Sequence, residues 1–95
     1  MTSSSPKSIL IVEDEKDIAQ LVKHYLEKEG FQTHLAKTGL EAQKLVASER
    51  PDMMILDLML PEMDGLEVCK SIRSKPETAM LPIIMLTAKI GRAHV

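Results

Sequence analysis

The chain contains little of the material from which several common kinds of site are built. It has no tryptophan, and Tyr25 and Phe31 are its only residues with phenyl or indole rings, so no platform for stacking nucleic-acid bases can be assembled. Cys69 is the single cysteine, which excludes a disulfide framework or a multi-thiolate metal site within one chain. Aliphatic and methionine side chains must therefore fill the core, and a reducing compartment suits the protein best.

Charge and hydropathy are also unremarkable along the chain. The formal net charge is −2, so no basic excess marks a nucleic-acid surface. No apolar run approaches the length of a membrane span, and residues 1–7 contain no apolar stretch of the kind found in secretory signals. The 95 residues have room for one domain. We therefore expect one cytoplasmic domain after a disordered leader at residues 1–7, without contact to membrane or nucleic acid.

Four short segments have the composition of β-strands. Residues 8–12, 53–57 and 82–87 are almost continuously apolar, which is typical of strands buried on both faces of a sheet. Residues 31–36 alternate only weakly and carry polar side chains, which favours a position near the sheet's edge. Strands of the first kind are characteristic of parallel sheets covered by helices.

Helical patterns separate these segments. The first is a predicted buried stripe made of Ile18, Leu21, Val22, Tyr25 and Leu26. The second begins at Thr38, where Thr38 and Glu41 have the spacing of a capping box. The third begins at Asp64 and Gly65, and its predicted inner face consists of Leu66, Cys69 and Ile72. The alternation predicts an α/β fold, a doubly wound parallel sheet with helices on both faces.

Polar side chains stand where three of the predicted strands end. Glu13 and Asp14 follow the first strand, Asp57 ends the third, and Thr87 ends the fourth. Taken singly, Asp57 has a structural explanation as a loop cap and Thr87 as a β-branched strand residue. Because the carboxyl ends of parallel strands share one edge of a sheet, we expect all four to lie close together.

The chemistry of this group favours a metal and a phosphoryl group. Three carboxylates in a small volume repel one another unless a cation compensates them, and oxygen-only ligands favour Mg²⁺. With such an ion bound, Asp57 can act as a nucleophile toward phosphorus, and Thr87 can donate a hydrogen bond to a phosphoryl oxygen.

The same residues resemble the receiver domain of bacterial response regulators in two-component phosphorelays. The resemblance extends over most of the chain from Lys7 to Ala88. Its motifs are the run at residues 9–14, then Asp57 with Leu60, Pro61, Asp64 and Gly65, and finally Leu86, Thr87 and Ala88. It implies a flavodoxin-like sheet with the strand order 2-1-3-4-5.

The resemblance also implies a mechanism. In that family Asp57 accepts a phosphoryl group from a histidine kinase or phosphotransfer protein. Asp14, Asp57 and the backbone carbonyl of Met59 hold Mg²⁺, and Glu13 acts through water. Thr87 meets the phosphoryl group and couples it to a surface change. The domain is then a signalling switch, not a turnover enzyme, and a DNA-binding output domain is expected in the full-length parent.

The sequence departs from the family after Thr87. Complete receivers continue through a helix, a fifth strand bearing an essential lysine, and a last helix, and Lys89 stands too early to replace that lysine. Residues 90–95 fit neither helical spacing nor the family, and they match the in-frame translation of a sequencing-library adapter (ATC GGA AGA GCA CAC GTC). We expect residues 8–89 to be a C-terminally truncated receiver, without its fifth strand and last two helices, and residues 90–95 to be a non-native tail.

Two other functions fit parts of the pattern. A haloacid-dehalogenase-like phosphatase also uses a strand-end aspartate and Mg²⁺, but it needs a second acid where this chain has Met59. A phosphorylation-independent interaction module with receiver shape, or a fragment without function, is the remaining alternative. Loss of the acidic pair is the usual sign of such a module, and Glu13 and Asp14 are both present.

Overall fold

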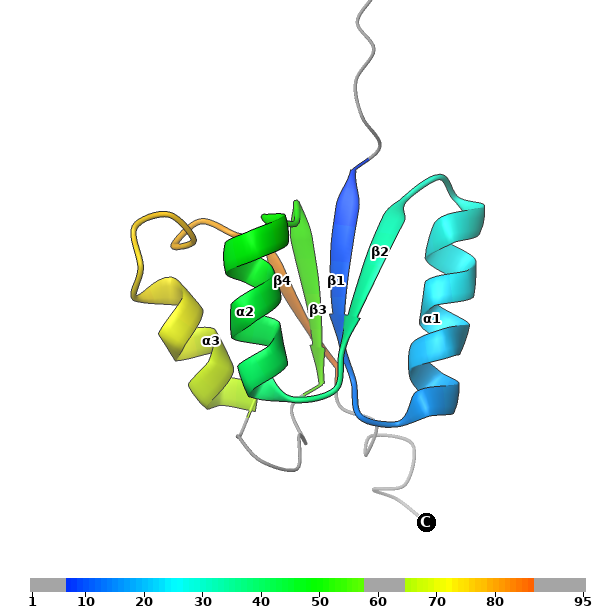
Figure 1. Ribbon diagram of the computed structural model, residues 1–95, viewed down its shortest axis with the longest axis horizontal. Helices are drawn as coiled ribbons and strands as arrows, with labels where there is room; N and C mark the ends of the chain where they lie inside the picture. Colours follow the sequence, from blue (N-terminus) through cyan, green and yellow to red (C-terminus); the bar gives the residue numbers. More distant parts are fainter. Residues whose placement is uncertain (1–6, 58–64, 87–95) are drawn as a thin grey trace, which may run out of the picture.

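Strands and helices alternate along the computed structural model, which describes residues 7–57 and 65–86. The elements are β1 (Ser8–Val12), α1 (Lys16–Lys28), β2 (Gln32–Ala36), α2 (Gly39–Glu49), β3 (Met53–Asp57), α3 (Gly65–Arg73) and β4 (Ile83–Leu86). All strand pairs are parallel, and the sheet has the order β2-β1-β3-β4 (Figure 1). This confirms the predicted α/β fold of flavodoxin type, and the described residues contain no fifth strand.

The helices cover opposite faces of the sheet. The chain moves from β1 to β2 in one direction and then from β2 past β1 to β3 in the other. Because such crossovers are right-handed, this reversal places α1 on one face and α2 and α3 on the other (Figure 1). The order reverses at β1 and β3, and open α/β sheets bind ligands beyond the carboxyl ends of the strands at such a point.

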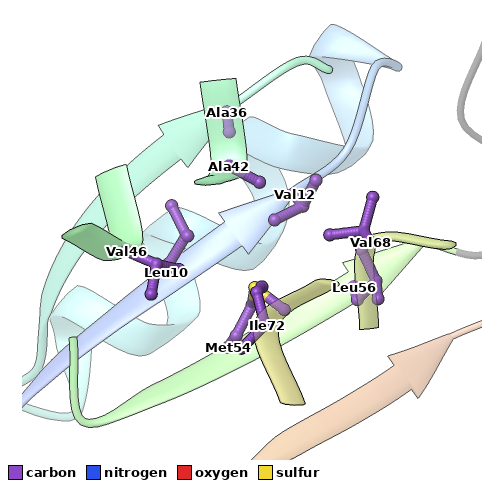
Figure 2. Close-up of a cluster of buried hydrophobic side chains, with 9 residues drawn as sticks. All are labelled: Leu10, Val12, Ala36, Ala42, Val46, Met54, Leu56, Val68 and Ile72. Atoms are coloured by element: carbon purple, nitrogen blue, oxygen red, sulfur yellow. The ribbon is translucent and has the colours of Figure 1, made fainter. Parts of the chain in front are cut away.

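The main core lies between the sheet and the pair α2 and α3. Figure 2 shows its nine buried side chains: Leu10, Val12, Ala36, Ala42, Val46, Met54, Leu56, Val68 and Ile72. The alternating residues Ile9 and Ile11 are also buried, with 1% of their surface exposed. Since successive side chains of a strand point to opposite faces, β1 is buried on both, as its continuous apolar sequence predicts.

Two predicted helix faces are partly wrong. In α1 the buried residue is Ala19, whereas Leu21 and Tyr25 are more than half exposed. In α3 Leu66 is 53% exposed, and the inner face is formed by the buried residues Gly65, Val68 and Ile72. Cys69 is half-buried and packs against the core, as predicted.

The start of α2 confirms half of the predicted capping box. The hydroxyl of Thr38 accepts the Glu41 N–H at 3.1 Å. The Glu41 carboxylate instead accepts the N–H of Lys37, at 2.7 Å, one residue before the position that the motif requires. Both contacts still satisfy N–H groups that would otherwise lack partners at the helix start.

The strand β4 is apolar along its length but lies at an edge of the sheet, as expected for a receiver without its fifth strand. Among the described residues it pairs only with β3, so it forms an edge of the sheet. Ile84, Met85 and Leu86 are 47%, 40% and 39% exposed. The opposite edge is β2, as its polar composition predicts, with only Ala36 fully buried. None of the helices within the described ranges is both long and apolar enough to cross a membrane.

Candidate functional site

Three carboxylates gather beyond the carboxyl ends of β1 and β3. Glu13 and Asp14 directly follow β1, and Asp57 is the last residue of β3. The parallel register pairs Val12 with Leu56, so both strands deliver their acidic residues at the same height. One oxygen atom from each carboxylate lies within 4.8 Å of the other two. The structure therefore brings together the three acidic residues that the sequence predicts.

Two residues of the cluster are buried, and the third, Asp14, is accessible to solvent. Glu13 and Asp57 are only 6% and 4% exposed, whereas Asp14 is exposed. The N–H of Glu13 donates to the carbonyl of Ala36 at 2.9 Å, which extends the β1–β2 ladder by one residue and fixes the backbone there. Its carboxylate accepts the N–H of Glu15 at 3.0 Å. No sequence signal indicates this last contact, because it depends on the turn that leads into α1.

The surroundings disfavour the charged form of Glu13. Burial raises the pKa of its carboxyl above the ordinary value, and the negative charges of Asp57 and Asp14 raise it further. The N–H of Glu15 opposes the shift by stabilising the ionised form. Packing two buried carboxylates side by side thus costs free energy in the metal-free protein, and a bound cation would offset that cost.

The raised pKa of Glu13 predicts that the effect of Glu13→Gln on stability depends on pH. Because the folded pKa of Glu13 is raised, its contribution to stability is fully present below the ordinary value of 4.5 and is lost as the pH rises through the folded pKa. Glutamine does not ionise, so the variant should gain stability relative to the wild type as the pH rises. Urea denaturation with EDTA over a pH series measures this difference.

The exposed neighbour Glu15 provides the control for that experiment. Glu15→Gln removes the same charge from a residue outside the acidic cluster and leaves the Glu15 N–H in place, so it controls for the loss of one negative charge near the start of α1. A Glu13→Gln difference that stays constant across the pH series would contradict the proposed repulsion.

The donor set fits Mg²⁺. Carboxylate oxygens are the ligands of hard divalent cations, and one exposed member leaves access for water and a substrate oxygen. Two oxygens bound to one Mg²⁺ lie about 3 to 4 Å apart, so the present spacing needs only a small movement or one intervening water. Met59 and Thr87, the other predicted site residues, lie outside the described residues.

A large cavity lies at the other end of the sheet and is separate from this cluster. It has a volume of about 860 Å³ and opens between the carboxyl ends of α2 and α3. Charged residues of both signs line it, namely Arg50, Asp52, Lys75 and Glu77. No acidic residue of the cluster lines this cavity, so its size does not bear on the chemistry proposed for the site.

Sequence comparison gives the chain relatives of known function. The family model described as response regulator receiver domain matches residues 9–95. The alkaline phosphatase synthesis transcriptional regulatory protein PhoP of Bacillus subtilis is 47% identical over 83 residues. The match covers 87% of this chain and 34% of PhoP, so the chain spans about a third of that relative's length.

Solved structures share the fold at substantial sequence identity. A putative response regulator from Chloroflexus aurantiacus has a TM-score of 0.85 and 36% identity, over 92% of this chain and 73% of that one. The response regulator TrrA of Thermotoga maritima, solved in complex with Mg(2+)-BeF, has a TM-score of 0.82 and 40% identity, over 93% of this chain and 75% of that one.

These matches agree with the geometry of the cluster. The fold, the strand order and the acidic residues at the switch point are those that the resemblance implies. The family model spans nearly all of the chain, which leaves the phosphatase alternative without support. This chain therefore belongs to the response regulator receiver domain family, whose members are signalling modules and not conventional enzymes.

Proposed function

We propose that this chain is the phosphoacceptor domain of a two-component response regulator, with Asp57 as the residue that is phosphorylated. The observation that carries the proposal is the position of Asp57, which is 4% exposed at the end of β3 and lies within 4.8 Å of Glu13 and Asp14, oxygen to oxygen. A lone strand-end aspartate would need no such neighbours, and the acidic pair is the feature that a phosphorylation-independent module would lack.

The proposed reaction transfers a phosphoryl group from phosphohistidine to a carboxylate. One carboxylate oxygen of Asp57 attacks phosphorus, the P–N bond of the donor breaks, and the histidine of the kinase or phosphotransfer protein leaves with its electron pair. Asp14, Asp57 and the carbonyl of Met59 would hold Mg²⁺, with Glu13 acting through water. Bound there, Mg²⁺ neutralises charge on the phosphoryl oxygens.

The phosphorylated domain acts by a change in the equilibrium between two conformations of the same fold. A phosphoryl group adds negative charge at a site that already holds three carboxylates. We assign the hydroxyl of Thr87 the role of donating to a phosphoryl oxygen and so coupling the charge to the surface. The free energy by which phosphorylation shifts this equilibrium is no larger than the difference between the interaction free energies of the phosphoryl group in the two conformations.

The chain is divided into three segments under this proposal. We propose a leader at residues 1–7 and a partial receiver at 8–89, both within a longer cytoplasmic parent, and a non-native tail at 90–95 that the parent lacks. The relative PhoP is named a transcriptional regulatory protein and extends well beyond the match, which supports a DNA-binding output domain in that parent. The net charge of −2 gives this domain itself no basic surface for nucleic acid.

Phosphorylation by a small acyl phosphate tests the proposal. We expect the full-length protein to gain the mass of one phosphoryl group when incubated with acetyl phosphate and Mg²⁺. The gain should disappear with EDTA, because the metal neutralises the incoming charge. It should also be reversed by neutral hydroxylamine, which cleaves acyl phosphates. A protein that folds and binds Mg²⁺ but gains no mass would favour the phosphorylation-independent module instead.

A further inference from the structure

Side-chain hydrogen bonds join the end of α3 to the connection that leads to β4. The Nη1 of Arg73, the last residue of α3, donates to the carbonyls of Ala79 and Leu81 at 2.9 and 2.5 Å. The hydroxyl of Thr78 donates to the carbonyl of Ile72 at 2.5 Å. The connection is thereby attached to α3 at both its middle and its end.

The sequence of β4 by itself does not define how the strand aligns with β3. All four residues of β4 are apolar, and three of them are more than a third exposed. In most strands the hydrophobic pattern sets the register, because a shift by one residue moves buried side chains to the solvent face. Ile83 packs against the core, but a one-residue shift would replace it with another apolar residue, so the composition of β4 distinguishes little between registers.

We propose that Arg73 is a positioning residue that sets the register of β4 and thereby which residue of β4 is paired with Asp57. The Leu81 carbonyl that it binds directly precedes Pro82, whose carbonyl accepts the Met54 N–H at 2.9 Å. Pro82 has no N–H group to contribute to the ladder. Arg73 thus holds the chain one residue before the first β3–β4 hydrogen bond.

The register has a direct consequence at the other end of the strand. It pairs Asp57 with Leu86, the residue immediately before Thr87. A shift by one residue would place a different residue beside the phosphoacceptor. The effect on Thr87 rests on the proposed function, whereas the effect on the register does not.

The test compares Arg73→Gln with Lys70→Gln by NMR on the full-length protein. Both residues are exposed on α3, and both changes remove one positive charge. We expect Arg73→Gln to lose the contacts of the Leu56–Met85 pair while keeping those of Ile11–Ile55. Lys70→Gln should keep both. Arg73→Lys should restore the β3–β4 contacts, because an ammonium group also donates to carbonyls.

A second measurement links the register to signalling. In the full-length protein, Arg73→Gln should change the lifetime of the phosphoryl group in the same direction as Thr87→Ala, with Mg²⁺ affinity unchanged. Wild-type β3–β4 contacts in Arg73→Gln would overturn the proposal. Loss of the Ile11–Ile55 contacts as well would mean that Arg73→Gln disrupts the whole sheet. In that case Arg73→Met, which keeps the apolar part of the side chain, is measured instead, and the β3–β4 contacts are judged in the same way. Absence of phosphorylation in every protein would reject the proposed function and leave the register result valid.

Discussion

The substitution Asp57→Asn is expected to abolish Mg²⁺-dependent phosphorylation of the full-length protein. Asparagine has nearly the same shape, so the end of β3 should remain in place. Its amide, however, is a far weaker nucleophile than a carboxylate and removes one negative charge from the metal site. Intact mass spectrometry after incubation with acetyl phosphate and Mg²⁺ measures the loss, which should be complete within detection.

The matched control is Asp17→Asn. Asp17 is an exposed residue in the first turn of α1, outside the acidic cluster, and the chemical change is identical. That variant should gain a phosphoryl group as the wild type does. Equal phosphorylation of Asp57→Asn would remove Asp57 from the role proposed here, whatever the family membership of the chain.

The second large effect is expected from Leu10→Ala, which should lower the free energy of unfolding by about 3 kcal/mol. Leu10 is fully buried in β1, at the centre of the core that α2 and α3 cover (Figure 2). The substitution removes apolar contacts and leaves a cavity that the central strand cannot close. Domains of this size have total stabilities of about 5 to 15 kcal/mol, so urea denaturation should show a much lower midpoint.

The control for Leu10→Ala is the same change at Leu40, which is 57% exposed near the start of α2. Because little apolar surface is lost there, the stability should change by no more than about 0.5 kcal/mol. Similar losses for the two variants would contradict the assignment of the core to the face covered by α2 and α3.

Much of the fold follows from patterns that tertiary contacts reinforce. The uniformly apolar residues 8–12 predict a strand covered by helices on both faces, and β1 has this burial in the interior of the sheet, between β2 and β3. The acidic cluster is predictable for a related reason. Once the strands are parallel, their carboxyl ends share an edge, and Glu13 and Asp57 must meet there.

The remaining details depend on contacts that no local pattern records. In α1 Ala19 is buried, whereas Leu21 and Tyr25 of the predicted apolar stripe are exposed, because the stripe alone does not record which of its sides meets the sheet. The exposure of β4 depends on what covers the sheet, which its own apolar residues do not reveal. The role of Arg73 depends on carbonyl groups six and eight residues further along the chain.

The adjacency of β1 and β3 couples cation affinity to folding. The carboxylates at the ends of these two strands come together only when the strands are paired, so an ion held by all three would bind the native state and not the unfolded chain. Each such equilibrium adds RT ln(1 + [L]/Kd) to the stability, about 2.7 kcal/mol at a hundredfold excess over Kd. An ion held by this cluster would therefore stabilise the paired strands β1 and β3, and with them the folded domain.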